Sequence, residues 1–309
     1  MSIRLNWISP AQPGDEVIIY RSSDVILDNA LPSPFASLAG NATEYVDDTN
    51  LLNVKYHYRV GFRKGTDVAL SPNRVLAEYA ELGIGPQTLR RGDYNVGYFG
   101  QCTPAELFDT VLLGSEVGMN VSNVLNAQPV WNKFIHDGKI KYIPNRVLSY
   151  STISHDAMYS LGLVYGRNDN GDPGAIAPVN QNKIVSRNGY SYRVKLLSTL
   201  DPGVDRSAGT TIQSMASAGK NSEVQQLFLR SLALGRLAYC GAPRQSLPNF
   251  LGIKRADMFG STNIMIAGRY SDGSVSRLDY NGAELIQKLA SNSAAASGGW
   301  LPVLELITP

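Results

Sequence analysis

Residues 56–62 read Tyr56-His57-Tyr58-Arg59-Val60-Gly61-Phe62 and alternate between two kinds of side chain. Successive side chains of a β-strand point to opposite faces, so this pattern predicts a strand with one apolar face. The apolar face would carry Tyr56, Tyr58, Val60 and Phe62, and the outer face would carry His57, Arg59 and Gly61. We therefore expect this strand to cover one side of a small β core.

Shorter strand signals surround this stretch, and proline and glycine separate them. Alternating or apolar runs of this length, with turn residues between them, are typical of an all-β sandwich. The runs are Ile3 to Trp7, Val17 to Tyr20, Tyr45 to Asp48 and Val75 to Tyr79. The sequence thus predicts a sandwich over residues 1–80.

Four of these segments, in this order, resemble the strands of a fibronectin type III domain. They are Leu5-Asn6-Trp7, Val17-Ile18-Ile19-Tyr20-Arg21, Tyr45-Val46-Asp47-Asp48 and Tyr56-His57-Tyr58-Arg59-Val60. The resemblance implies that Trp7 is the core tryptophan. It also implies that Tyr56 is the corner tyrosine, whose hydroxyl bonds to an upstream backbone group.

That family has a further strand before the tryptophan strand, whereas this sequence begins almost at Trp7. A truncated sandwich with an exposed edge is therefore expected. Such an edge either accepts a strand from a partner or is covered by a second domain, and the sequence leaves both readings open.

The full length of 309 residues is enough for two domains. Hydrophobic residues make up 43% and charged residues 17%, a balance typical of globular proteins. Gly83, Gly85 and Pro86 lie close together and predict a linker at residues 81–92. The remainder, residues 93–309, is expected to form a larger α+β domain.

The clearest local signal in this remainder is the stretch from Trp131 to Pro144. It contains Asp137-Gly138 between two alternating runs, which predicts a β-hairpin with a type I′ turn. Further elements are predicted more weakly from spacing and caps. They are a helix from Pro104 to Leu113 behind the capping box Thr103–Glu106, a short helix after Ser154, a helix over 222–239, and strands over 94–99, 190–196, 264–266, 274–278 and 300–307.

Residues 93–309 resemble, in the order of their segments, a domain of large virion structural proteins of tailed phages. The segments include Trp131 to Pro144, Leu163 to Gly166, Tyr192 to Leu197, Ser222-Glu223 and Gly299 to Leu306. The closing strand with Trp300 is also similar to the last strand of C-type-lectin-like folds. The resemblance implies a protein of the virion that is made in a host cytoplasm. Residues expected to determine the fold are Trp7, Tyr56, Tyr58, Trp131, Asp137, Gly138 and Trp300.

The reactive side chains show no spacing typical of catalysis, metal binding or cofactor binding. Cys102 and Cys240 have no metal-ligand spacing and no signal peptide precedes them, so both are expected to be reduced and buried. His57 and His136 are expected on the surface, and His155 follows a helix cap. We therefore predict no enzyme, no cofactor and no metal site.

Two further patterns bear on partners. The net charge is +2 without a basic cluster, and no apolar run reaches membrane-spanning length, so neither nucleic-acid binding nor membrane insertion is expected. Residues Asn168 to Asp172 partly resemble a calcium loop but lack its distal glutamate, and a solvated turn is the simpler reading.

The leading hypothesis is thus a structural component of a tailed-phage virion, in the tail, baseplate, collar or fibre apparatus. It would act through contacts with other virion proteins and as a homo-oligomer, a trimer or a ring. The alternative is a lectin-like module that binds host surface glycan. A third reading, a polysaccharide depolymerase, requires two carboxylates that face a cleft.

Overall fold

The computed structural model describes residues 2–8, 15–149, 154–170, 178–202, 219–227, 263–269, 275–279, 285–289 and 298–308. Within these ranges β-strands predominate and helices are short. The chain divides into two compact units. The first comprises Met1–Leu82 and Asp93–Asn95, and the second comprises Gly83–Gly92 and Val96–Pro309.

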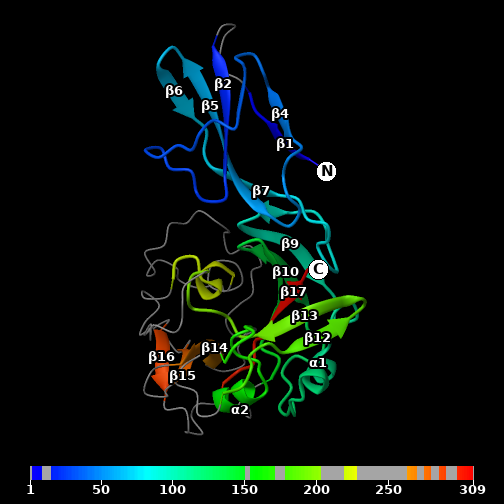
Figure 1. Cartoon of the computed structure of the whole chain (residues 1–309). Helices are drawn as coiled ribbons and strands as arrows, with labels where there is room; N and C mark the ends of the chain where they lie inside the picture. Colours follow the sequence, from blue (N-terminus) through cyan, green and yellow to red (C-terminus); the bar gives the residue numbers. More distant parts are fainter. Residues whose placement is uncertain are drawn as a thin grey trace. The chain divides into compact units, whose positions relative to one another are not determined.

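The first unit consists of antiparallel sheets in a sandwich-like arrangement (Figure 1). One sheet pairs β1 (Ile3–Asn6) with β4 (Glu44–Asp47). The other has the order β3-β2-β5-β6, and β7 also pairs with β5. Its strands are β2 (Glu16–Ser22), β3 (Ala36–Ala39), β5 (Lys55–Lys64), β6 (Asp67–Leu70) and β7 (Arg74–Ala77). The strands that the sequence predicts correspond to β1, β2, β4, β5 and β7. Strands β3 and β6 were not predicted.

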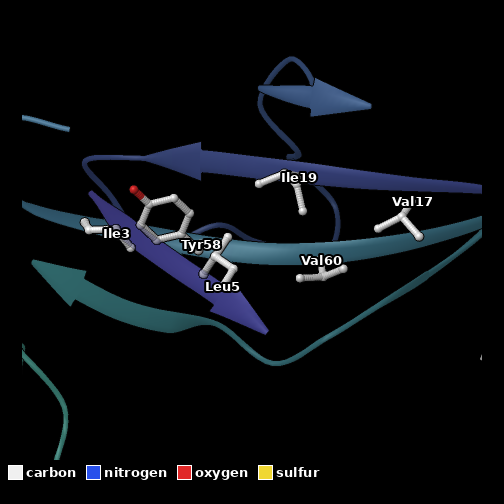
Figure 2. Close-up of a cluster of buried hydrophobic side chains, with 6 residues drawn as sticks. All are labelled: Ile3, Leu5, Val17, Ile19, Tyr58 and Val60. Carbon is white, nitrogen blue, oxygen red and sulfur yellow. The ribbon is translucent and has the colours of Figure 1, made fainter. Parts of the chain in front are cut away.

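The core of the first unit lies between its two sheets. Figure 2 shows six buried side chains, contributed by β1, β2 and β5, that gather in one cluster. They are Ile3, Leu5, Val17, Ile19, Tyr58 and Val60. Trp7 and Tyr56 are partly buried and pack against this cluster. Burial of these side chains supplies the main stabilisation of the unit, at about 1.5–3 kcal/mol for each large apolar side chain.

The outer face of β5 differs from the sequence prediction. His57 and Arg59 are 5% and 7% exposed, so the expectation of an outward-facing His57 is wrong. Arg59 donates from Nε to the carbonyl of Ser71 at 2.7 Å and pairs with Asp28. The segment around Asp28 therefore covers this face of β5, and the strand is buried on both sides.

The second unit contains a seven-stranded antiparallel sheet with the order β12-β13-β17-β11-β10-β9-β8. Figure 1 labels β9, β10, β17, β13 and β12 of this sheet. Its strands are β8 (Arg91–Gly92), β9 (Val96–Cys102), β10 (Trp131–His136), β11 (Lys139–Pro144), β12 (Ile184–Arg187), β13 (Tyr190–Lys195) and β17 (Val303–Ile307). A smaller sheet joins β14 (Asn263–Arg269), β15 (Val275–Asp279) and β16 (Leu285–Leu289). The C-terminal strand β17 lies inside the large sheet, so it fixes β11 and β13 on either side.

The hairpin at Trp131–Pro144 is confirmed. β10 pairs with β11 from Trp131 opposite Pro144 to His136 opposite Lys139. Asp137 and Gly138 have φ angles of 51° and 73°, the left-handed values that a type I′ turn requires at both central positions. Residues 83–92, for which the sequence predicts a linker, are grouped with the second unit, and Arg91–Gly92 pairs with β9 as β8.

The helix predicted from Pro104 is wrong in its position. Thr103 and Glu106 do exchange the hydrogen bonds of a capping box, but they close a single turn. The carbonyl of Phe108 accepts from the indole of Trp131 at 2.8 Å, and the amide of Leu112 donates to the Asp109 carboxylate. Because these bonds replace the helical ones, α1 begins only at Thr110 and spans Thr110–Val117.

The remaining predictions of this unit fall into two groups. The helix after Ser154 is confirmed as α2 (His155–Ser160), and the strands over 190–196, 264–266, 274–278 and 300–307 correspond to β13, β14, β15 and β17. Strand β16 was not predicted. Of the helix predicted over 222–239, residues 223–227 are helical and the rest lies outside the described residues, as does Cys240.

Candidate functional site

A polar hollow of about 550 Å³ lies in the second unit, beside the end of the large sheet. Four cationic and four acidic side chains line it, together with His136 and Tyr165. The charged residues are Asp137, Lys139, Lys141, Arg167, Lys195, Asp201, Glu223 and Glu305. Its volume falls in the usual range for small-molecule sites, about 300–1,000 Å³.

The register of the sheet brings three charged residues into one row. Glu305 on β17 lies opposite Arg193 on β13 and opposite Lys141 on β11. Directly opposed residues of antiparallel strands share a face, so the three side chains meet. Glu305 pairs with Arg193 at 3.2 Å and with Lys141 at 3.6 Å. Opposite charges therefore alternate across adjacent strands.

Glu223 comes from the helical residues 223–227 and completes the network above this row. Its Oε1 accepts from the ammonium groups of Lys141 and Lys195, and its Oε2 accepts from the backbone amide of Ser198 at 2.9 Å. The Glu223 side chain is only 3% exposed. A buried carboxylate of this kind is stable only with such partners, since desolvation alone would cost several kcal/mol.

The charge states follow from burial and from these partners. Burial opposes ionisation of Glu223, but Lys141 and Lys195 outweigh it and hold the pKa of this carboxyl well below its usual value. Burial likewise opposes ionisation of Glu305, and Lys141 and Lys195 again lower its pKa. Both carboxylates are therefore ionised at neutral pH.

His136 is the neutral member of the network. Burial and the nearby Lys141 lower its pKa to about 4. Its Nε2 lies 2.7 Å from the carbonyl of Asn221, so Nε2 carries the proton and donates. Nδ1 is then the acceptor for the Lys141 ammonium at 3.3 Å. The expectation of a surface His136 is wrong, because the segment with Asn221 and Glu223 covers the end of β10.

Lys133 is a further buried cation of this unit, and it lies on the face of β10 opposite to His136. It is fully buried and donates from Nζ to the carbonyls of Pro86 at 2.8 Å and Gly83 at 3.5 Å. Burial lowers its pKa to about 8. Residues 83–86 are thereby fixed to the sheet, and the hydroxyl of Tyr142 adds a bond to the carbonyl of Ile84 at 2.9 Å.

The residues that the sequence singles out occupy different parts of the molecule. Trp131 and Trp300 are fully buried in the second unit, and Tyr58 is buried in the first. Trp7 donates from Nε1 to the carbonyl of Ala42 at 2.7 Å, and Tyr56 accepts from the amide of Leu51 at 3.4 Å. Asp137 is the one residue of this set that lines the hollow, beside Gly138 in the hairpin turn.

Other predicted features also have a place in the structure. His155 is fully buried and Cys102 is a buried free cysteine, whose pKa burial raises to about 12. Asp169 pairs with Arg167 at 2.7 Å, and part of the predicted Asn168–Asp172 loop lies outside the described residues. The described ranges hold no group of three or more His, Cys, Asp and Glu side chains arranged to hold a metal ion.

The network of Lys141, Glu223 and Glu305 was missed by the sequence analysis. Its members are far apart in the chain, and no short motif links them. One signal was present: Lys139 and Lys141 alternate with Ile140 and Tyr142 in a strand that the hairpin turn had already located. Alternating lysines on a central strand of a sheet require counter-charges from its neighbours.

Comparisons with known proteins provide no family for this chain. No protein-family model matches it, and neither a curated protein nor a solved structure is significantly similar to it. Among the described helices, none is both long and apolar enough to cross a lipid bilayer.

Proposed function

We propose that the chain is a structural component of a tailed-phage virion and acts through protein–protein contacts. The observation that carries the proposal is the sheet arrangement of the first unit. β1 pairs with β4, and the order β3-β2-β5-β6 faces them across the Ile3–Val60 cluster. This arrangement supports a fibronectin type III-like module, a kind of unit that attaches proteins to one another.

The edge of β1 supports the same proposal. Among the described residues, β1 pairs with β4 and with no other strand. Such an edge offers backbone N–H and C=O groups to a partner strand. In this proposal the partner is a neighbouring virion protein or a second copy of the chain in a trimer or ring.

Two carboxylates of the hollow, Glu223 and Glu305, bear on the depolymerase reading. A glycosidase that works near neutral pH needs one carboxyl group with a raised pKa as general acid. Glu223 and Glu305 both have lowered pKa values, because lysines neutralise them. Neither of these two carboxylates is therefore suited to be the general acid of a depolymerase.

The alternative function is a lectin-like module that recognises host surface glycan. The polar hollow favours it, since its lining combines fixed hydrogen-bonding groups with Tyr165. Both functions are compatible with a position on the outside of a particle.

The test is mass spectrometry of gradient-purified phage particles from the source, with copy number measured against the major capsid protein. We expect the chain at tens of copies or fewer per particle. Its absence from purified particles would overturn the virion proposal. If the chain is present, labelling of the particle would locate it at the tail, baseplate, collar or fibre.

A further inference from the structure

The hollow in the second unit has the properties of a binding site and not of a gap in the fold. Its floor is built from buried charged side chains. Glu223 and Glu305 each pair with more than one cation, and Lys195 is held by Glu223. Its rim carries Lys139 and Arg167, whose side chains are 58% and 40% exposed. A preorganised floor with accessible polar groups above it is the usual anatomy of a small-molecule site.

The charges of the lining balance. The four cationic side chains face four carboxylates, and His136 is neutral at physiological pH because its pKa is about 4. The hollow therefore attracts neither anions nor cations strongly. It does offer both hydrogen-bond donors and hydrogen-bond acceptors at close spacing.

Donors and acceptors are both available to a ligand. The ammonium group of Lys195 has three N–H bonds, and its one hydrogen bond within the described residues goes to Glu223. Arg167 contacts Asp169 through its Nε and Nη2 atoms, and its guanidinium has five N–H donors in all. Among the acceptors, Asp201 lines the hollow, and its Oδ1 also accepts from the backbone amide of Asn221.

We infer that the hollow binds an uncharged saccharide. Neighbouring hydroxyl groups of a sugar donate and accept at the same time, so they fit a lining of paired charges better than an ion would. Tyr165 also lines the wall, with 4% of the residue exposed. The inference rests on the lectin-like alternative in one respect: that alternative identifies the saccharide as part of a host surface glycan.

Two rim variants test the site, and each has a matched control in the first unit. Arg167→Met removes a cation that is 40% exposed and lies 2.7 Å from its carboxylate; Arg63 has the same exposure and the same distance to Glu16. Lys139→Met removes a cation that is 58% exposed and 3.4 Å from Glu305; Arg4 is 64% exposed and 3.4 Å from Glu44. The controls are Arg63→Met and Arg4→Met.

The experiment begins with the full chain on an array of uncharged oligosaccharides of glucose, galactose, mannose, rhamnose and N-acetylglucosamine. Calorimetry with the strongest binder then compares the variants. We expect Arg167→Met and Lys139→Met to weaken binding at least about fivefold and the two controls to change it less than twofold. Raising the salt concentration from 0.05 to 0.5 M should change Kd less than twofold, because exposed charge–charge attraction is screened by salt and this ligand has no charge.

A second measurement does not depend on the variants. Hydrogen exchange of the full chain should show added protection at 163–167 and 198–202 when the oligosaccharide is present. The inference is overturned if no uncharged oligosaccharide binds at millimolar concentration, if protection appears elsewhere, or if only anionic glycans bind and salt abolishes the binding. Absence of the chain from phage particles would leave these results unchanged, and absence of saccharide binding would leave the virion proposal unchanged.

Discussion

The hydroxyl of Tyr58 on β5 donates a hydrogen bond of 2.6 Å to the carboxylate of Asp47 on β4, and so joins the two sheets of the first unit. Asp47 is fully buried and also accepts from Arg21 and from Thr49. Burial opposes its ionisation, but Tyr58, Arg21 and Thr49 outweigh this and lower its pKa. The link is therefore a charge-assisted hydrogen bond across the core.

Tyr58→Phe should lower the free energy of unfolding of the first unit by about 1.5–3 kcal/mol, the usual contribution of a hydrogen bond to a charged group. Hydrogen exchange of the peptides that contain β1 to β7 measures this locally. Tyr56→Phe is the matched control on the same strand. The Tyr56 hydroxyl accepts from the amide of Leu51 at 3.4 Å, which is long for a hydrogen bond. We therefore expect the free energy of unfolding to fall by less than about 0.5 kcal/mol. Equal effects of both variants would contradict the link.

The second unit should lose stability as the pH falls below the ordinary pKa of histidine. His136 is buried among Lys141, Glu223 and Lys195, and burial with Lys141 lowers its pKa from 6.5 to about 4. Between these values the unfolded chain binds a proton that the folded chain excludes, so stability is complete above pH 6.5 and falls toward pH 4, by up to about 3 kcal/mol. Thermal denaturation from pH 7.5 to 4.5 measures the slope. His136→Gln should flatten it, and an unchanged slope would contradict the assignment.

Glu223→Gln should destabilise the second unit by about 3–5 kcal/mol, because it leaves Lys141 and Lys195 buried without a full counter-charge. The surface control Glu16→Gln, which breaks the exposed pair with Arg63, should cost less than about 1 kcal/mol. Urea denaturation of the full chain gives both values. An effect of Glu223→Gln as small as that of the control would mean that the network carries no stability.

Gly138→Ala should cost about 1–2 kcal/mol, because the φ angle of 73° is left-handed and a Cβ is disfavoured there. Asp137→Asn is the control, since asparagine adopts this conformation readily. Thermal denaturation of the two variants measures the difference. Equal melting temperatures would show that the turn geometry does not stabilise the hairpin.

Local chemistry explains which elements could be predicted from the sequence. The hairpin at Asp137-Gly138 is encoded by two adjacent residues, and the strand over 56–62 by its alternation. The prediction was correct for the inner face of that strand and wrong for its outer face. The segment around Asp28 covers Arg59, and the periodicity of a strand does not predict that another segment covers it. The start of α1 was wrong because the carbonyl of Phe108 bonds to Trp131, 23 residues away.

The residues of the candidate site were harder to predict from the sequence than the hairpin or the strand. Lys141 and Glu223 are 82 residues apart. Glu223 contacts both Lys141 on β11 and Lys195 on β13, the two strands on either side of β17. Neither residue type is distinctive by itself, and a lysine or a glutamate is usually exposed. The strand order brings these residues together in a buried network, and no local sequence pattern predicts the strand order.

The enclosure of Lys133 has a chemical consequence. Acylating reagents attack the free amine, and this amine is fully buried beneath residues 83–86. Lys139, which is 58% exposed, would be modified at once, whereas Lys133 can react only after that segment separates from the sheet. The rate at which Lys133 is acylated thus reports how often residues 83–86 separate from the large sheet of the second unit.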